Sequence, residues 1–317
     1  MKKKLIILLV LIVVGIPMLL LLLGGSVAAA YALGFIKPPE LVRTSNGWGN
    51  VTRSHTQIIT SITIDNPNAI GIGLGNVGVE ADIFMNDVLM GRGESRGIDL
   101  PEGISTSQLT TSIDNSLIPE WWASHIANDE QTEVSVTAEG VVSLLGRRLS
   151  VSAPGINRDF ETDLLRNADS NQHETFSIGP YDITLKERRF QWGSVSDDRT
   201  EIDGTVVVHN GTPAPIPVTR IEFDATMNGI LIAQGSTTGQ MVLQPGEDTE
   251  IPVTIVIEHA LLLNWWPTHI NNDERTDYHI DAEATLVADL PVIGRQILSL
   301  PLLSHSDVLQ TNILGVQ

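Results

Sequence analysis

Residues 79–91 read VEADIFMNDVLMG, and this stretch decides the fold. Along residues 79–86 the inward positions Val79, Ala81, Ile83 and Met85 alternate with a second set, which is the period-two pattern of a strand with one buried face. Asn86-Asp87 follows, and both residue types tolerate a positive φ, so a tight hairpin turn is expected there. The stretch therefore predicts a pair of antiparallel strands.

The same pattern recurs along the rest of the chain. Residues 221–232 read IEFDATMNGILI, with Asn228-Gly229 at the turn, and further alternating runs lie at residues 58–64, 109–113, 134–138, 202–208, 253–257 and 278–282. Helical spacing is expected only at residues 117–126 and 261–270. These features predict a mainly β chain with two tandem antiparallel β-sandwich domains of immunoglobulin or fibronectin type, each with one short helix.

A duplication is visible in the sequence itself. At an offset of 144 residues, WWASHIANDEQT at 121–132 meets WWPTHINNDERT at 265–276. Tryptophan, histidine and the Asn-Asp-Glu run recur at the same places, as Trp121, Trp122, His125, Asn128, Asp129 and Glu130, then Trp265, Trp266, His269, Asn272, Asp273 and Glu274. The predicted domains are residues 46–170 and 171–317.

This repeated motif is the sharpest candidate for chemistry. A histidine near carboxylates could bind a divalent cation. The spacing lacks the HxH or HExxH pattern of metal hydrolases, so a structural role is favoured, in which the tryptophans fill the core and Asn-Asp-Glu forms the turn into the next strand. We expect no metal, no cofactor and no catalytic residues.

Two other motifs carry little functional weight. Gly73–Gly78 matches GxGxxG, but a strand pattern follows where a dinucleotide site needs a helix, so we interpret this segment as a flexible loop. Asn50-Val51-Thr52 and Asn210-Gly211-Thr212 are candidate glycosylation sites, at Asn50 and Asn210.

Composition excludes several classes of protein. The chain has 38 acidic and 19 basic residues, a net charge of −19 and no cysteine. Such an acidic body repels phosphates, which argues against nucleic-acid binding, and the absence of cysteine excludes disulfides and thiol catalysis.

The N-terminus predicts a membrane anchor. Residues 5–23 are apolar without one charge, long enough at about 1.5 Å per residue to cross the hydrocarbon core. A cleaved signal peptide is the alternative, but its apolar region runs only about 7–15 residues. Because Lys2, Lys3 and Lys4 precede the segment, we expect a cytoplasmic tip at 1–4, an anchor and exit at 5–35, a linker at 36–45, and domains outside a single-pass cell membrane protein.

One copy resembles a known family. Residues 62–68 read ITIDNPN, and residues 85–93 read MNDVLMGRG after the next strand. These motifs resemble the group-2 late embryogenesis abundant domain, also called the water stress and hypersensitive response (WHy) domain. The second copy departs at the turn, where Asn210-Gly211-Thr212 replaces Asn-Pro-Asn. The resemblance implies two tandem copies of a folded, non-enzymatic β-sandwich associated with desiccation or osmotic stress.

Two functions remain open at this stage. The first is a membrane-anchored, non-enzymatic protein that protects or binds other envelope components during desiccation or osmotic stress. The alternative is an adhesion or assembly subunit of the cell envelope, with the sandwiches as spacers and partner-binding modules. The expected partners are the membrane, through the N-terminal helix, and other envelope proteins.

Overall fold

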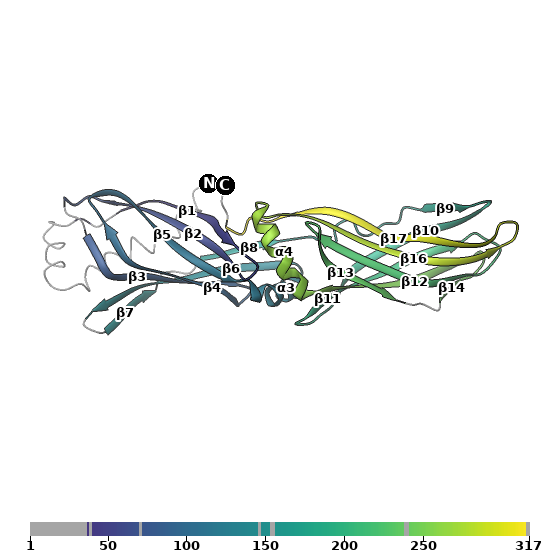
Figure 1. Ribbon diagram of the computed structural model, residues 1–317, viewed down its shortest axis with the longest axis horizontal. Coiled ribbons are helices and arrows are strands. Elements are labelled where there is room, and N and C mark those ends of the chain that lie inside the picture. The colour runs from purple at the N-terminus through teal and green to yellow at the C-terminus, as the bar shows by residue number, and fades with distance from the viewer. Residues whose placement is uncertain are drawn as a thin grey trace. The chain divides into compact units, whose positions relative to one another are not determined.

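The computed structural model describes residues 37, 40–69, 72–144, 147–152, 156–237 and 241–314. The chain divides into two compact units (Figure 1). Unit 1 comprises Met1–Trp121, Thr132–Phe160 and Asn312–Gln317, and unit 2 comprises Trp122–Gln131 and Glu161–Thr311.

Unit 1 contains an eight-stranded sheet in the order β1-β2-β5-β4-β3-β6-β7, with β8 paired to β6. The strands are β1 (Glu40–Val51), β2 (His55–Asn66), β3 (Ile72–Met85), β4 (Val88–Leu100), β5 (Gly103–Asp114), β6 (Gln131–Leu144), β7 (Arg147–Ser152) and β8 (Ile156–Glu161). Neighbouring strands in the order from β1 to β7 pair antiparallel.

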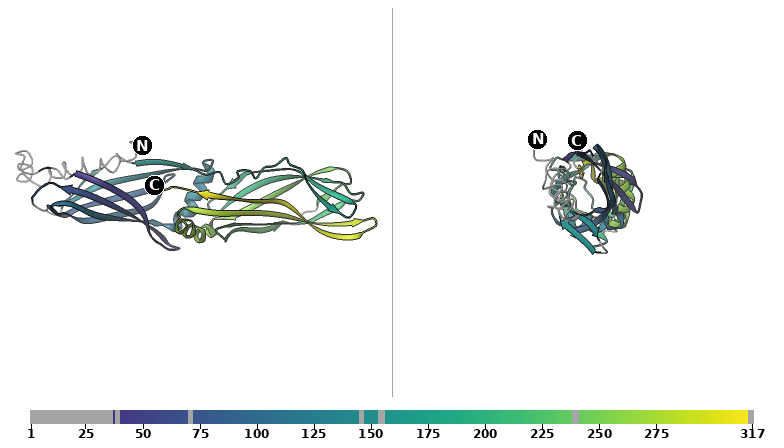
Figure 2. Two further views of the ribbon diagram at one scale, coloured as in Figure 1. Left: turned by 90° about the horizontal axis from the view of Figure 1, so that it is seen from above. Right: turned by 90° about the vertical axis from the view of Figure 1, so that its left-hand side faces the viewer.

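Unit 2 contains a nine-stranded sheet in the order β17-β16-β12-β13-β15-β11-β10-β9, with β14 paired to β12. The strands are β9 (Glu174–Ile178), β10 (Tyr181–Val195), β11 (Arg199–Asn210), β12 (Ile216–Met227), β13 (Ile230–Thr237), β14 (Met241–Leu243), β15 (Asp248–Glu258), β16 (Arg275–Leu290) and β17 (Gly294–Gln310). Figure 2 shows the long β16–β17 hairpin along unit 2.

The short helices lie where the sequence predicts them. A 3-10 turn at Asn115–Leu117 leads into α3 (Ile118–Ala127), and α4 spans His259–Asn271. The predicted mainly β class, with antiparallel ladders and one short helix after β5 and after β15, is confirmed. No helix in the described part of the chain is long and apolar enough to cross a membrane. The predicted anchor at residues 5–23 lies outside the described residues.

The predicted hairpin turns are present. Asn86 and Asp87 have φ values of 48° and 66°, and Asn228 and Gly229 have values of 50° and 73°. Two successive residues in the left-handed region are what a two-residue turn needs to match the twist of its strands. This backbone requirement explains why asparagine, aspartate and glycine stand at these positions.

The buried faces of the strands are mostly aliphatic and depend on strand alternation. In β16 buried and more exposed residues alternate along the whole strand, as expected for a strand with one buried face. In unit 1, Ala81 of β3, Ala138 of β6 and Leu109 of β5 form one buried cluster. Strands from different parts of this sheet therefore contribute to one core.

In each sheet, two neighbouring strands share few paired residues. In unit 1, β4 and β5 share only the pairs Gly91–Ile113, Arg92–Ser112 and Gly93–Thr111. In unit 2, β13 and β15 share the single pair Ala233–Ile257. The glycines of β4 allow close approach at this junction, because a Cβ on Gly91 would overlap the carbonyl of Ser112.

Two sequence interpretations need correction. Gly73–Gly78, interpreted as a flexible loop, is part of β3, and the β3–β4 register shifts between Leu74 and Gly78. Glycines tolerate such an irregularity inside a strand, so they do not interrupt it. In addition, β1 begins at Glu40, inside the segment predicted as a linker.

We predict that Gly91→Ala destabilises the protein by about 1–3 kcal/mol, because backbone atoms of β5 must move to admit the methyl group. Chemical denaturation measures the change. The matched control is Gly47→Ala in β1, where a Cβ meets nothing within 4 Å. Equal stability of the two variants would contradict this account of the junction.

Candidate functional site

The structure places the repeated motif at the end of each helix and in the turn that follows. The backbone N–H groups of Asn128 and Asn272 donate to the carbonyls of Ser124 and Thr268, at 3.0 and 3.1 Å. The next two residues in each copy are left-handed, with φ values of 53° and 59° for Asp129 and Glu130, and 56° and 60° for Asp273 and Glu274. The two copies therefore leave the helix through the same turn.

In the second copy the buried polar groups form one hydrogen-bonded chain. Trp265 Nε1 donates to Thr276 Oγ1 at 2.8 Å, and this hydroxyl lies 2.9 Å from His269 Nδ1. His269 Nε2 lies 2.9 Å from Thr311 Oγ1, which donates to Glu274 Oε2 at 3.0 Å. Each hydroxyl has one proton, so this network assigns His269 as neutral with its proton on Nε2.

The first copy repeats this chemistry around Glu130. Trp121 Nε1 donates to Thr132 Oγ1 at 3.0 Å within unit 1. In unit 2, His125 Nε2 lies 2.9 Å from Thr162 Oγ1, which donates to Glu130 Oε2 at 2.6 Å. Thr162 thus connects histidine to glutamate in the first copy, as Thr311 does in the second.

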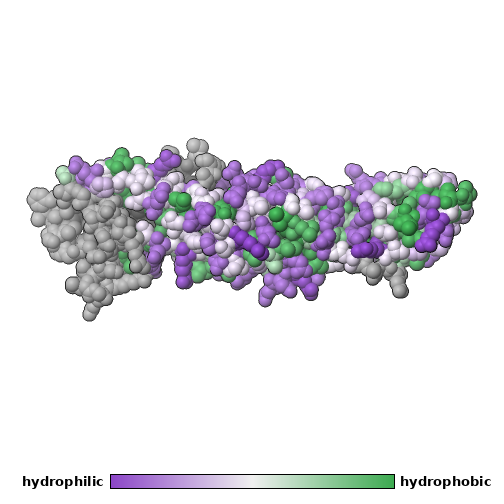
Figure 3. Space-filling model, viewed as in Figure 1, coloured by the Kyte–Doolittle hydropathy of each residue, from purple (hydrophilic) through white to green (hydrophobic). Residues whose placement is uncertain are grey.

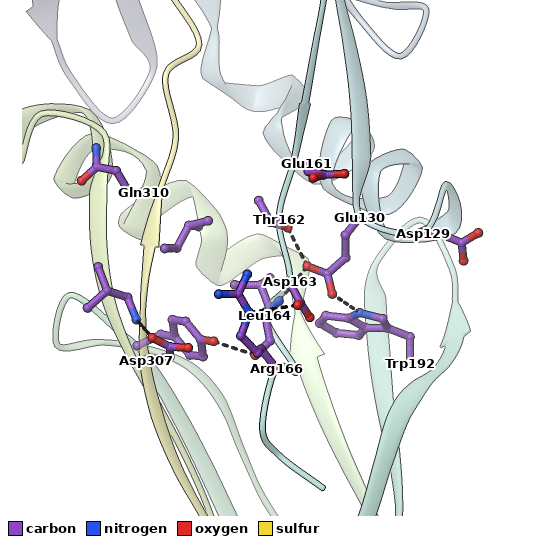
Figure 4. Close-up of a pocket in the computed structure, with 13 residues that line it drawn as sticks. Asp129, Glu130, Glu161, Thr162, Asp163, Leu164, Arg166, Trp192, Asp307 and Gln310 are labelled. Atoms are coloured by element: carbon purple, nitrogen blue, oxygen red, sulfur yellow. Dashed lines mark hydrogen bonds and ion pairs between the residues drawn. The ribbon is translucent and has the colours of Figure 1, made fainter.

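The Glu130 carboxylate is buried and has donors on both oxygens. Leu164 N donates to Oε2 at 2.8 Å, beside the Thr162 hydroxyl, and Trp192 Nε1 donates to Oε1 at 2.8 Å (Figure 4). Hydrogen bonds to an ionised acceptor are among the stronger ones, and they offset the cost of removing the charge from water. Glu130 therefore fixes the segment from Thr162 to Leu164 and the Trp192 ring within unit 2.

The tryptophans of unit 2 pack edge to face. The ring centroids of Trp122 and Trp265 are 6.0 Å apart at 77°, and those of Trp265 and Trp266 are 6.1 Å apart at 76°. Trp192 meets Trp122 at 6.5 Å and 84°. Such tilted arrangements are favoured by the charge distribution of the rings. Trp122, Trp265 and Trp266 are fully buried core residues, whereas Trp192 is half-buried and lines the pocket described below.

Burial lowers the pKa of both motif histidines to about 4. In His125 a backbone hydrogen bond at Gln131 opposes that effect only in part. Low dielectric surroundings disfavour a charged imidazole, which agrees with the neutral form that the hydrogen bonds of His269 require. The two histidines are uncharged at neutral pH.

A pocket of about 600 Å³ opens beside Glu130 in unit 2. It is lined by the turn after α3, the segment before β9, and strands β10, β16 and β17: Asp129, Glu130, Glu161, Thr162, Asp163, Leu164, Arg166, Trp192, Tyr278, Asp307, Val308, Leu309 and Gln310. Five carboxylates face one arginine, so the pocket disfavours anions. Figure 4 shows these side chains around the opening.

Tyr278 is a neutral polar group of the pocket. Its hydroxyl donates to the carbonyl of Leu164 at 2.7 Å. Burial, followed by the negative charges of Asp307, Glu130 and Asp163, raises the pKa of the phenol far above its ordinary value. The Tyr278 hydroxyl therefore stays protonated and acts as a hydrogen-bond donor, not as a base.

Sequence reasoning missed the partners of the motif. Thr162, Thr311 and Trp192 bond to its residues but lie 32, 37 and 62 positions away. The sequence did mark Trp192, because Trp48-Gly49 and Trp192-Gly193 align at the 144-residue offset of the duplication. Thr162 and Thr311 follow β8 and β17, and no motif marks them.

A serine, a histidine and an aspartate also meet on β16 and β17. His279 Nδ1 lies 2.5 Å from Ser306 Oγ, and the His279 Nε2 is in contact with the Asp281 carboxylate. The three belong to neighbouring strands and none lines the pocket beside Glu130. The three side chains lie on the surface strands outside that pocket, and we assign them no catalytic role.

The two glycosylation sequons differ in accessibility. Asn50 is exposed in β1, whereas the Asn210 side chain is fully buried. Asn210 Nδ2 donates to the carbonyls of Ala214 and Leu243, both at 2.9 Å, and its Oδ1 accepts from Thr212 N. A glycan on Asn210 requires these bonds to break. Among the described residues, no three histidine or acidic side chains are arranged to hold a metal ion.

Comparisons with known proteins point to one family. The late embryogenesis abundant protein model matches residues 205–297. A desiccation protectant protein Lea14 homologue from Glycine max is 32% identical over 114 residues, which cover 36% of this chain and 72% of that protein.

Two solved structures are similar in part. A crystal structure of a protein from Archaeoglobus fulgidus shares 24% identity over 40% of this chain and 98% of its own, with a TM-score of 0.36. A solution structure from Arabidopsis thaliana shares 22% identity over 39% and 78%, with a TM-score of 0.30. At these TM-scores the structures carry no argument about function.

We predict that Glu130→Gln lowers the free energy of unfolding by about 2–3 kcal/mol, because an amide cannot accept on both sides from Thr162, Leu164 and Trp192. The control is Asp129→Asn, at the neighbouring exposed position with positive φ, which asparagine tolerates. Denaturant titration of both variants measures the difference. A Glu130→Gln protein as stable as Asp129→Asn would refute the role given to this carboxylate.

We further predict a loss of stability in acid caused by the motif histidines. Their pKa is about 4 in the folded chain and about 6.5 when unfolded, so the unfolded chain binds protons first. Relative to acid, each histidine therefore adds about 3 kcal/mol to the free energy of unfolding at neutral pH. This stability is fully present above about pH 6.5 and is lost as the pH is lowered towards 4.

Unfolding measured at pH 7 and pH 4.5 gives this slope, which His269→Gln should reduce. An unaltered slope in His269→Gln would show that His269 is not the titrating group.

Proposed function

Because the chain belongs to the late embryogenesis abundant protein family, we propose that it is a non-enzymatic protein that protects or binds other cell components during water loss or salt stress. The observation that carries this proposal is the 32% identity with a desiccation protectant over 72% of that protein. The match of residues 205–297 to the family model places the likeness in unit 2.

The geometry of the repeated motif supports a role without catalysis. Its histidines are neutral and their ring nitrogens bond to threonine hydroxyls inside the fold. Glu130 has donors on both carboxylate oxygens. A general base must reach a substrate proton, and these groups instead satisfy each other.

The surface chemistry also fits water stress. With 38 acidic and 19 basic residues, the chain keeps a large negative charge at neutral pH. A net charge far from zero keeps proteins soluble and apart from one another. Carboxylates also hold water strongly, so the acidic surface stays hydrated as water becomes scarce.

We include in the proposal that the two units are tandem copies of a WHy-type β-sandwich. In each copy an asparagine before the signature turn accepts from the amide two residues on: Asn66 from Asn68 N at 3.1 Å, and Asn210 from Thr212 N at 3.0 Å. The second copy thus keeps the turn geometry without Asn-Pro-Asn. The matching Trp121–Thr132 and Trp265–Thr276 hydrogen bonds support the same reading.

The proposed location is the cell envelope. Residues 5–23 are apolar and uncharged and follow three lysines, which supports a single membrane anchor with a cytoplasmic N-terminus and both domains outside. Outside the cell, Asn50 is the accessible glycosylation site of the two sequons.

A deletion strain tests the proposal. We expect its survival after drying and rewetting, and after salt shock, to fall well below that of its parent, and the full-length chain to restore it. A parent-like survival of the deletion strain would overturn the protective role. Stoichiometric copurification with one envelope protein, together with normal survival, would favour the adhesion or assembly function instead.

A further inference from the structure

The hairpin between β16 and β17 exposes apolar side chains at its apex. At the apex Val292 is 94% exposed; Ile297, further down β17 opposite Val287, is also exposed, at 71%. Pro291 lies beside Val292 and is also exposed. Figure 3 shows hydrophobic surface at this end of unit 2. Single exposed apolar residues are ordinary, but an apex made of Pro291, Val292 and Ile293 is a continuous apolar tip.

The backbone at the apex is strained. Val292 has a φ of 76°, in the left-handed region that β-branched residues avoid. A turn with proline at its second position and a positive φ at its third normally has glycine or asparagine at the third. Folding alone therefore favours another residue here. A strained residue at an exposed place is an observation that points to a binding role.

The apex is held by its neighbours in unit 2. The Ile293 side chain packs over Gly179 of the β9–β10 turn. A Cβ built on this glycine would lie 3.4 Å from the Ile293 side chain. Tyr181 donates its hydroxyl to the Pro291 carbonyl at 3.3 Å, and Gln296 donates to the Ile293 carbonyl at 2.9 Å. The tip is thus a fixed, convex projection whose backbone carbonyls at Pro291 and Ile293 already have donors.

The two strands carry one charge of each sign just below the apex. Asp289 and Arg295 are cross-strand partners just below the apex and are both exposed. Each lies three positions from Val292 along the chain, so at about 3.3 Å per residue they lie within roughly 10 Å of the apex. Interfacial segments bury their apolar side about 5–10 Å into the boundary between head groups and acyl chains. Such insertion brings this pair to the phosphate and ammonium groups of zwitterionic lipids.

We propose that the β16–β17 apex inserts into the interface of a zwitterionic lipid bilayer, as a membrane contact independent of the N-terminal segment. A convex apolar tip is buried by a deformable medium, whereas a flat protein surface covers little of it. The acidic chain, with its net charge of −19, is repelled by anionic lipids, so the attraction comes from the apolar apex. The occupant is therefore phosphatidylcholine-type lipid.

A single fluorescent probe tests this insertion. The chain contains no cysteine, so Val292→Cys in the full chain carries one environment-sensitive label. The labelled protein is held in nanodiscs, which occupy its N-terminal apolar segment, and is then mixed with phosphatidylcholine vesicles. We expect a blue shift and stronger emission at position 292. The control is Ile104→Cys, at a residue that is 69% exposed in unit 1, whose label should not respond.

A substitution separates binding from folding. Val292→Asn removes the apolar side chain and suits the positive φ, so we expect unchanged or higher thermal stability with roughly tenfold weaker vesicle binding. Ile104→Asn should leave binding unaltered. Phosphatidylglycerol should weaken binding. The proposal is overturned by a label that stays water-exposed with vesicles, by equal binding of Val292→Asn and the parent, or by binding that needs anionic lipid.

Discussion

The fold depends on satisfying polar groups that are buried where each helix turns into the following strand. Leaving a buried donor or acceptor without a partner costs about 1–3 kcal/mol, and more for a charge. Tryptophan, histidine and glutamate meet at this place, and threonine hydroxyls connect them. The chain from Trp265 through Thr276, His269 and Thr311 to Glu274 has a donor and an acceptor at each step.

This constraint also explains the unusual backbone of the turns. Asp129 and Glu130, like Asp273 and Glu274, hold two successive left-handed conformations that residues with a Cβ seldom adopt. The carbonyl of Glu130 accepts from Thr162 N, and that of Glu274 accepts from Thr311 N, both at 3.0 Å. Backbone and carboxylate of the same residue therefore bind the segment that follows the last strand. Burial keeps the imidazole of each motif histidine neutral, so the glutamate carboxylate is the charged group of each network.

Interior and exterior have separate roles in the proposed function. The interior is aliphatic and aromatic, and its histidines and glutamate are bonded to other side chains of the fold. The exterior is strongly acidic, which favours hydration and keeps molecules apart. The apex of the β16–β17 hairpin departs from this pattern, since a strained valine lies there in solvent. Protection during water loss and a lipid contact at one tip are compatible, because they use different surfaces.

The sequence by itself determined the local features: strands with period-two burial, the two-residue turns at Asn86-Asp87 and Asn228-Gly229, and the helix positions. Each depends on neighbouring residues only. The tertiary structure decided which distant groups complete the motif, such as Thr162 and Trp192 on Glu130, and that Asn210 is buried while Asn50 is exposed. It also kept Gly73–Gly78 within β3. These outcomes depend on which strands pair and how they pack, and no local periodicity encodes that choice.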